Sequence, residues 1–162
     1  MTAPVRIRPA GRAELELLAA LHALAFTPPD VAGPPWSADA LATTLAHPGA
    51  FALLAVDEEA VPGEPLGLLL AWAVAGEGEI LTVGTVPAAR RRGVARALME
   101  AALLEMRRRD AEALFLEVAE TNGPARRFYS VLGFTEVGRR PGYYRLGGTS
   151  VAALVLRRSL DR

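Results

Sequence analysis

Two side chains that can move protons stand twelve residues apart in the second half of the chain. Glu117 lies near the end of a predicted strand at 113–118 whose other side chains are apolar, and Tyr129 lies on the helix predicted after it. A carboxylate in such a strand costs desolvation unless an arginine pairs with it or it works as a general base. A tyrosine there is either an ordinary core residue or a weak acid that can protonate a leaving thiolate of pKa ~8.5. The residues alone leave both roles open.

A basic turn lies upstream, between a predicted strand at 79–83 and a predicted helix that ends near Asp110. It carries three consecutive arginines at 90–92, followed by Gly93. The first N–H groups of a helix lack partners within it and its dipole favours negative charge, so such a turn predicts an anion site. Gly93 permits close approach, and arginine forks match the oxygens of a diphosphate. A run of arginines can equally be a solvated surface.

Composition narrows the classes of protein. The 162 residues fit one domain, and 18 basic and 18 acidic side chains give a net charge near zero, which does not favour a nucleic-acid or anionic-membrane surface. The chain has no cysteine, and its only histidines, His22 and His47, lack metal-ligand spacing, so we expect no metal site. No apolar run reaches the ~18 residues that span a bilayer, and the N-terminus lacks a signal-peptide pattern. We therefore expect a cytoplasmic protein.

The remaining pattern predicts a single α/β domain over residues 1–162. Gly84 interrupts the strand before the basic turn and predicts a bulge or a close backbone approach. His22, on an apolar helix face, and Trp36, after a proline-rich loop, each suit either the core or a substrate wall. Two strand–helix–strand connections indicate helices packed on a mixed sheet. Strands are predicted at 5–8, 51–56, 66–74, 79–83, 113–118, 135–140 and 150–157, helices at 14–26, 38–47, after residue 93 and after residue 123, and a loop at 141–148.

Several motifs together resemble the GNAT acetyltransferase superfamily and, within it, the RimI-type ribosomal-protein-alanine N-acetyltransferases. Arg90-x-x-Gly93-x-Ala95 after a strand is similar to the acetyl-CoA pyrophosphate loop of the superfamily. The segment LFLEVAETNGPARRFYSVLGF at 114–134 is similar to the region that follows the cofactor helix in the RimI-type family. The Pro-Trp-Ser at 35–37 and the Tyr-Tyr pair at 143–144 also match that family.

The resemblance implies a fold, a co-substrate and two catalytic roles. The fold would be the GNAT fold, an α/β (α+β) domain with a mixed, mostly antiparallel sheet of about seven strands and about four flanking helices. Acetyl-CoA would be the co-substrate, without a metal, and Glu117 and Tyr129 would be the general base and the general acid. The residues that would bind acetyl-CoA are Val83, Gly84, Thr85, Arg90, Arg91, Arg92, Gly93, Val94, Ala95, Arg96 and Asn122.

The implied acceptor is the N-terminal α-amine of a protein, such as a ribosomal protein, which would attack the acetyl group directly in a ternary complex. Trp36, Tyr143 and Tyr144 would wall its slot. Departures from the family pattern, such as Ala119 where an arginine is common, fall on this acceptor side. Two alternatives therefore stay open: an acetyltransferase of the same superfamily acting on a small-molecule amine or a lysine, and a non-catalytic acyl-CoA-sensing module. No direct nucleic-acid or membrane partner is expected.

Overall fold

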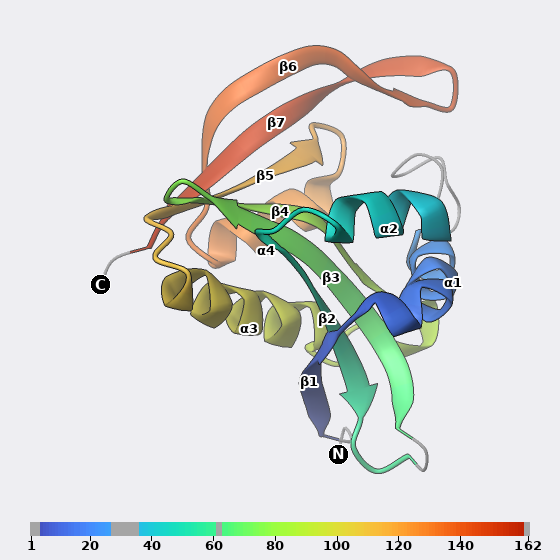
Figure 1. Cartoon of the computed structure of the whole chain (residues 1–162). Helices are drawn as coiled ribbons and strands as arrows, with labels where there is room; N and C mark the ends of the chain where they lie inside the picture. The colour runs from blue at the N-terminus through green and yellow to red at the C-terminus, as the bar shows by residue number, and fades with distance from the viewer. Residues whose placement is uncertain (1–3, 27–35, 61–62, 161–162) are drawn as a thin grey trace.

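The computed structural model describes residues 4–26, 36–60 and 63–160. In this part of the chain a seven-stranded sheet with the order β1-β2-β3-β4-β5-β7-β6 forms the centre of the molecule (Figure 1). Neighbouring strands are antiparallel except for β4 and β5, which confirms the predicted mixed sheet. The strands are β1 (Val5–Ala10), β2 (Ala50–Asp57), β3 (Glu64–Val74), β4 (Glu77–Thr85), β5 (Ala113–Ala119), β6 (Thr135–Leu146) and β7 (Thr149–Ser159).

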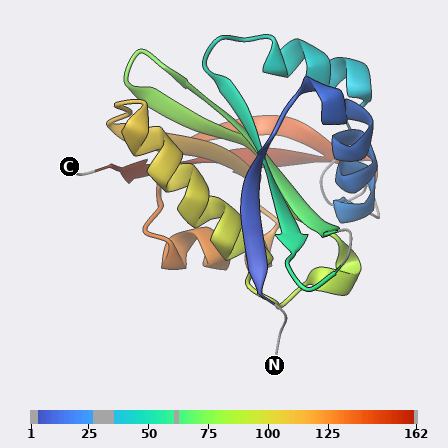
Figure 2. The same ribbon diagram turned by 60° about the horizontal axis from the view of Figure 1, so that its bottom comes forward.

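Four α-helices cover the two faces of the sheet in the described residues (Figures 1 and 2). They are α1 (Leu15–Ala25), α2 (Ala38–Leu45), α3 (Val94–Arg108) and α4 (Gly123–Val131). Helices α1 and α2 pack on one face and α3 and α4 on the other, which gives two apolar cores. None of these helices is long and apolar enough to cross a membrane.

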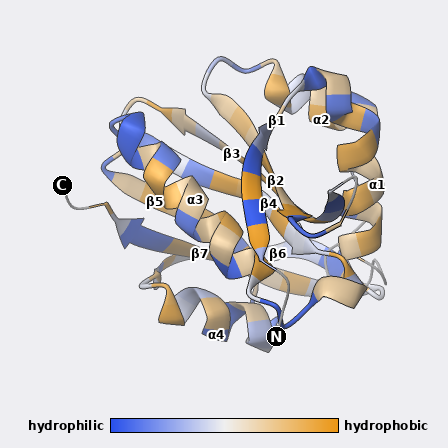
Figure 3. Cartoon of the chain, turned by 90° about the horizontal axis from the view of Figure 1, so that it is seen from below, coloured by the Kyte–Doolittle hydropathy of each residue, from blue (hydrophilic) through white to orange (hydrophobic). Residues whose placement is uncertain are grey.

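Strand β3 shows why the middle of the sheet is apolar on both sides. Leu68 and Leu70 pack with α1 and α2, whereas Leu69 and Ala71 pack with α3, because successive side chains of a strand point to opposite faces. All four side chains are fully buried, and burying a leucine stabilises the fold by ~1.5–3 kcal/mol. Figure 3 shows the contrast with the edge strand β1, where hydrophilic and hydrophobic residues alternate.

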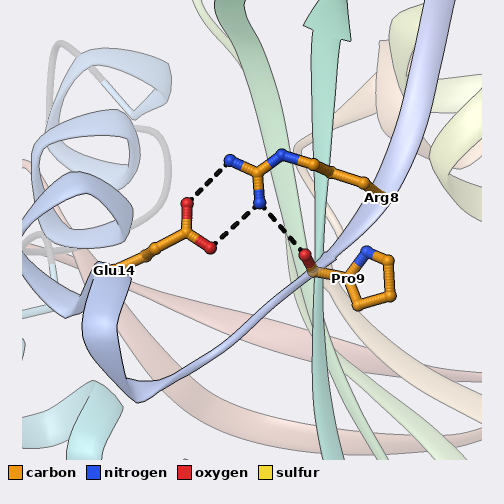
Figure 4. Close-up of polar contacts among 3 residues, drawn as sticks. All are labelled: Arg8, Pro9 and Glu14. Atoms are coloured by element: carbon orange, nitrogen blue, oxygen red, sulfur yellow. Dashed lines mark hydrogen bonds and ion pairs between the residues drawn. The ribbon is translucent and has the colours of Figure 1, made fainter.

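The connection from β1 to α1 is fixed by an ion pair. Arg8 donates from Nη1 to Oε1 of Glu14 at 2.9 Å and from Nη2 to Oε2 at 2.7 Å (Figure 4). Nη1 also donates to the carbonyl oxygen of Pro9 at 3.1 Å. Glu14 closes the short 3₁₀ turn Arg12–Glu14 that leads directly into α1. This two-pronged contact therefore sets the direction in which α1 leaves the sheet.

The parallel pairing of β4 and β5 is short. It joins Glu77–Ile80 to Ala113–Leu116 and then stops, although β4 continues to Thr85 and β5 to Ala119. The next residue of β4, Leu81, forms a β-bulge. Its neighbours Ile80 and Thr82 pair with two consecutive residues of β3, and Leu81 itself pairs with no residue of β3. A bulge bends its strand and ends local pairing. Of the two roles predicted for Gly84, a bulge or a close backbone approach, the bulge is absent, because Gly84 pairs regularly with Leu68.

Three predicted boundaries also differ from the structure. Strand β1 continues through Pro9 to Ala10, which is possible because β1 is an edge strand and a proline there loses no ladder bond. Helix α2 ends at Leu45, so His47 lies beyond it rather than in its last turn. Strand β6 continues to Leu146 across a register shift between Arg140 and Tyr144. The predicted loop at 141–148 is thus largely strand, and Tyr143 and Tyr144 lie on β6.

Candidate active site

A groove of about 630 Å³ lies where β4 and β5 have separated. It contains every residue predicted to bind acetyl-CoA except Arg92. Its walls come from the end of α1, the end of β4, the turn before α3 and the starts of α3 and α4. They are formed by Ala25, Phe26, Val83, Gly84, Thr85, Ala89, Arg90, Arg91, Gly93, Val94, Ala95, Arg96, Asn122, Pro124 and Phe128.

The start of α3 presents free backbone donors to this groove. Gly93 is the N-cap in the left-handed conformation, with φ +76°. Apart from its chain neighbours and the helix backbone, none of the described residues lies within 4 Å of the place where a Cβ would stand. The first helical hydrogen bond runs from the Ala97 N–H to the Gly93 carbonyl. Among the described residues, nothing accepts from the N–H groups of Val94, Ala95 and Arg96, and the first turn holds no acidic side chain. Such an end of a helix binds anions.

The side chains of the basic turn differ in what they contact. Arg92 lies outside the groove and pairs with Asp57 at the end of β2, with Nη2 at 3.2 Å from Oδ2. Arg96 pairs with Glu100 one turn along α3 at 3.1 Å, on the exposed surface. The Arg91 side chain has no hydrogen bond or ion pair with any described residue. Arg91 is therefore the arginine of this turn most available to a bound anion, and Arg92 fastens the turn to the sheet.

The remaining arginine of the turn, Arg90, holds the end of α1. Its Nη2 donates to the carbonyl oxygen of Ala25 at 3.0 Å. The last residues of α1 also press against Gly84, where a Cβ would stand 2.8 Å from Cβ of Ala25 and 3.0 Å from the Phe26 ring. Gly84 is thus a close-approach position as predicted, and the group that approaches it is α1. Because Phe26 is held here, it forms part of the groove wall.

A second cavity, of about 430 Å³, adjoins the groove. The two share Phe26, Val83 and Asn122, so they meet between the end of α1, the free part of β4 and the start of α4. Both predicted catalytic residues and all three predicted acceptor-wall residues line this second cavity. Its lining includes His22, Phe26, Trp36, Thr82, Val83, Glu117, Ala119, Asn122, Tyr129, Tyr143 and Tyr144.

Glu117 points into the second cavity from β5. Its Oε1 lies 3.0 Å from Nε of Arg140, and the side chain of Glu117 is only 17% exposed. The pairing of Glu117 with an arginine, one of the two alternatives open from the sequence, is therefore present. Glu117 lines the cavity as well. Arg140 comes from β6, and β7 lies between β6 and β5, so the sequence order gave no sign of this contact. The pair holds the Glu117 carboxyl group at the cavity wall.

Tyr129 is the most deeply buried of the site tyrosines. Its ring packs edge-on against Phe128 and Phe134, and burial, with a smaller effect of Tyr144, raises the pKa of its hydroxyl to about 12. The hydroxyl makes no hydrogen bond to a described residue. Because no side-chain polar atom of the described residues is both fully buried and without a hydrogen bond, the hydroxyl oxygen must be accessible from the cavity. At neutral pH this phenol carries its proton and can donate it.

His22 belongs to both the core and the cavity wall. Its Nδ1 accepts from the backbone N–H of Trp36 at 3.2 Å, and its Nε2 lies 3.2 Å from Oγ1 of Thr82, to which it can donate. The ring packs between Phe26 at 4.4 Å and the indole of Trp36 at 5.6 Å. Burial lowers the pKa of His22 to about 4, so the imidazole is neutral near pH 7. Because both nitrogens are engaged, His22 orders the wall and is not a free base.

Aromatic rings and one amide complete the acceptor side. Trp36 is half-buried against His22, and Tyr143 and Tyr144 meet edge-on with ring centres 5.0 Å apart. Burial, and then the nearby Glu117 carboxylate and Tyr143, raise the pKa of Tyr144 to about 12. The Asn122 side chain accepts from the N–H of Ala125 at 3.3 Å, so Asn122 is the N-cap of α4.

Comparisons with known proteins agree with this geometry. The sequence pattern of the acetyltransferase (GNAT) family matches residues 16–134, most of the chain. The chain is 33% identical over 147 residues to the N-alpha-acetyltransferase RimI of Mycobacterium tuberculosis, a match that covers 91% of this chain and 89% of that protein. It is 32% identical over 82 residues to the [Ribosomal protein bS18]-alanine N-acetyltransferase of Escherichia coli K12, which covers 51% of this chain and 55% of the relative. That second match therefore spans about half the length of the relative.

Solved structures share the fold at low sequence identity. The ribosomal-protein-S18-alanine N-acetyltransferase of Escherichia coli superposes with a TM-score of 0.86 at 21% identity, covering 98% of this chain and 96% of that one. Arabidopsis thaliana NAA60 in complex with acetyl-CoA superposes with a TM-score of 0.80 at 21% identity, covering 98% and 100%. The chain belongs to the acetyltransferase (GNAT) family, and its fold is the GNAT fold.

The burial of neutral His22 predicts a pH-dependent stability. The unfolded histidine has a pKa near ~6.5 and takes up a proton below it, whereas the folded one does so only near pH 4, so the unfolded state binds more protons between these values. The free energy of unfolding should therefore fall as the pH drops from about 6.5 to about 4, by roughly 3 kcal/mol at most from this residue. Urea titrations across this range should show a flatter dependence for His22→Gln. The same change of the free energy of unfolding with pH in the wild type and the variant would contradict this prediction.

Proposed function

We propose that this protein transfers an acetyl group from acetyl-CoA to the N-terminal α-amine of a protein, by direct attack within a ternary complex. The observation that carries the proposal is the junction of two differently built cavities at Phe26, Val83 and Asn122. One presents helix-start donors that suit a diphosphate, and the other presents a carboxylate and a protonated phenol. Two reactants held on either side of this junction would meet without a covalent enzyme intermediate.

The groove fits acetyl-CoA on three counts. The free N–H groups at the start of α3 and the unpaired Arg91 suit the diphosphate. The open space beside Gly93 admits a bulky ligand close to the backbone. The free edge of β4 from Val83 to Thr85 has no partner in β5 and can bond to the amide-containing arm. When bound, acetyl-CoA supplies an activated acetyl group on a thiol that leaves easily.

The residues of the second cavity handle the protons. Glu117 accepts a proton from the acceptor ammonium, so that the nitrogen gains a free electron pair. Tyr129 holds its proton at neutral pH and gives it to the departing sulfur. The second proton that the attacking nitrogen loses as the amide forms returns to the Tyr129 oxygen. Trp36 and the Tyr143–Tyr144 pair close the cavity around the end of the acceptor chain. Arg140 keeps the Glu117 carboxylate paired and in place between turnovers.

An α-amine suits this site better than a lysine. The pKa of a chain N-terminus is ~7.7–8.0 and that of a lysine is ~10.4, so freeing a lysine nitrogen at pH 7 costs roughly 3.4 kcal/mol more. One carboxylate does the deprotonation, since both nitrogens of His22 are engaged. The two relatives at 32–33% identity are named as an N-alpha-acetyltransferase and as a [Ribosomal protein bS18]-alanine N-acetyltransferase. We therefore propose an alanine-starting acceptor, such as a ribosomal protein, acetylated in the cytoplasm.

Replacing Gly93 should weaken acetyl-CoA binding. Gly93→Val strains the left-handed N-cap and fills the open space, so the affinity measured by calorimetry should fall at least about tenfold. Gly147→Val is a matched control, because Gly147 also has a positive φ, of 59°, and open space, but it lies in the turn between β6 and β7 outside both cavities. Both variants should lose similar stability, and Gly147→Val should keep its affinity. Equal affinity of the Gly93 variant and the wild type would exclude this groove as the acetyl-CoA site.

Removing either of the two proton-transferring groups should slow turnover, while the affinity for acetyl-CoA should stay the same. Glu117→Gln keeps the shape and removes basicity, so kcat near neutral pH should fall by ~10²–10⁴. Tyr129→Phe should also lower kcat. Glu120→Gln is the matched control, since Glu120 also pairs with an arginine, Arg139 at 2.7 Å, but does not line the cavity. Full activity in both site variants, measured by release of free thiol, would exclude Glu117 and Tyr129 as the base and the acid. Binding of acetyl-CoA by the wild type without any release of thiol would favour the non-catalytic sensing module.

The acceptor class can be tested with paired peptides. A peptide with a free N-terminal alanine should be acetylated at least about tenfold faster than the same peptide with a blocked terminus and one internal lysine, because the lysine holds its proton more tightly. The modified nitrogen is identified by mass spectrometry of fragments. A preference for the lysine peptide, or activity only on small amines, would reject the proposed acceptor and keep the acetyltransferase.

A further inference from the structure

The acceptor cavity continues into a compartment that the mechanism above does not use. This compartment, of about 390 Å³, shares Glu79, Leu116 and Glu117 with the acceptor cavity. It lies over the paired part of β4 and β5, next to the turn between β3 and β4. An acceptor whose α-amine reaches Glu117 therefore has its next residues at the mouth of this compartment, since each extended residue spans ~3.3–3.6 Å.

Two aromatic side chains, Trp72 and Phe115, line this compartment. Trp72 donates from its indole Nε1 to Oε2 of Glu79 at 3.1 Å, and its ring packs against His47 with centres 5.1 Å apart. These contacts fix the indole before any ligand arrives. The guanidinium of Arg157 lies over the Phe115 ring, with its Cζ 5.8 Å from the ring centre. Aromatic walls of this kind suit the methylene stem of a long side chain.

The charge of the compartment is negative. Three carboxylates line it, Glu77, Glu79 and Glu117. Two guanidinium groups lie at or beside it: that of Arg140, which is paired with Glu117, and that of Arg157, which lies over the Phe115 ring. The exposed Glu77 side chain makes no hydrogen bond or ion pair with any described residue. A cationic head placed here would find an unpaired carboxylate at the rim, while an acidic one would be repelled.

We infer that this compartment selects acceptors with an arginine or lysine at the second or third residue, and that Glu77 is the residue that determines this preference. The inference rests on the proposed N-terminal acetylation. The stem of the cationic side chain lies along Trp72 and Phe115, and its head lies beside Glu77. Because the contact is exposed, it contributes modestly to affinity and is weakened by salt.

Three alanine-starting peptides test this inference. They carry arginine, glutamine or glutamate at both the second and third positions and are otherwise identical. For the wild-type protein kcat/KM should follow the order arginine, glutamine, glutamate, with roughly a tenfold ratio between the first and last in low salt. That ratio should shrink as sodium chloride is raised to ~0.5 M, because the Debye length falls below the reach of the contact.

Charge reversal at Glu77 locates the source of the preference. In Glu77→Arg the ratio between the arginine and glutamate peptides should fall to about one or invert. Glu136→Arg makes the same change on an exposed strand residue outside both parts of the acceptor cavity, and it should keep the wild-type ratio. Thermal unfolding of each variant verifies the fold, and Glu77→Gln, which only removes the charge, should give an intermediate ratio.

The outcomes separate the two proposals. If none of the peptides is acetylated while acetyl-CoA binds, the proposed acceptor fails. If all three are acetylated at equal rates, or if the preference survives in Glu77→Arg, N-terminal acetylation stands and the selective compartment is overturned.

Discussion

The parallel pairing of β4 and β5 stops after Ile80 and Leu116, and the candidate site exists because it stops there. Backbone donors and acceptors inside a protein need partners, and two strands that part inside a sheet leave some of theirs without any. The bulge at Leu81 turns β4 away while β3 continues to pair with it up to Thr85. The free edge of β4 then faces a groove, and β5 carries Glu117 into the neighbouring cavity.

The end of α1 is the second structural requirement, because it forms a wall common to both cavities. Arg90 holds the carbonyl of Ala25, and Gly84 leaves room for the helix end to press against β4. His22, one turn earlier, bonds to the backbone of Trp36 and to Thr82. The same helix is thus tied to the basic turn before α3 by one arginine and to the wall of the second cavity by one histidine. Its direction is set at the other end by the Arg8–Glu14 pair.

The sequence predicted the local structure better than the contacts between distant segments. The order of helices and strands follows from patterns within a few residues, and the structure has it. The residues predicted for the site, except Arg92, line two adjoining cavities. The pairing of Arg140 with Glu117 could not be predicted, because it depends on β7 inserting between β5 and β6. Likewise three consecutive arginines look alike in the sequence, but their contacts differ. Arg90 holds α1, Arg92 pairs with Asp57, and Arg91 has no partner among the described residues. At Gly84 the sequence left a bulge and a close approach open, and the structure has the close approach, in which the approaching group is α1. The bulge lies instead at Leu81, which no glycine marks.

The most direct test of the central proposal is the affinity of a conjugate that would occupy both cavities at once. In this conjugate an acetyl linker joins coenzyme A to an alanine-starting peptide, with its methylene carbon on the sulfur and its carbonyl carbon on the peptide α-amine. Calorimetry compares the Kd of the conjugate with that of coenzyme A. If the two cavities form one ternary site, the conjugate should bind at least about tenfold more tightly, because the second half binds without a separate loss of translational freedom. Equal affinities of the conjugate and of coenzyme A alone would contradict a common site.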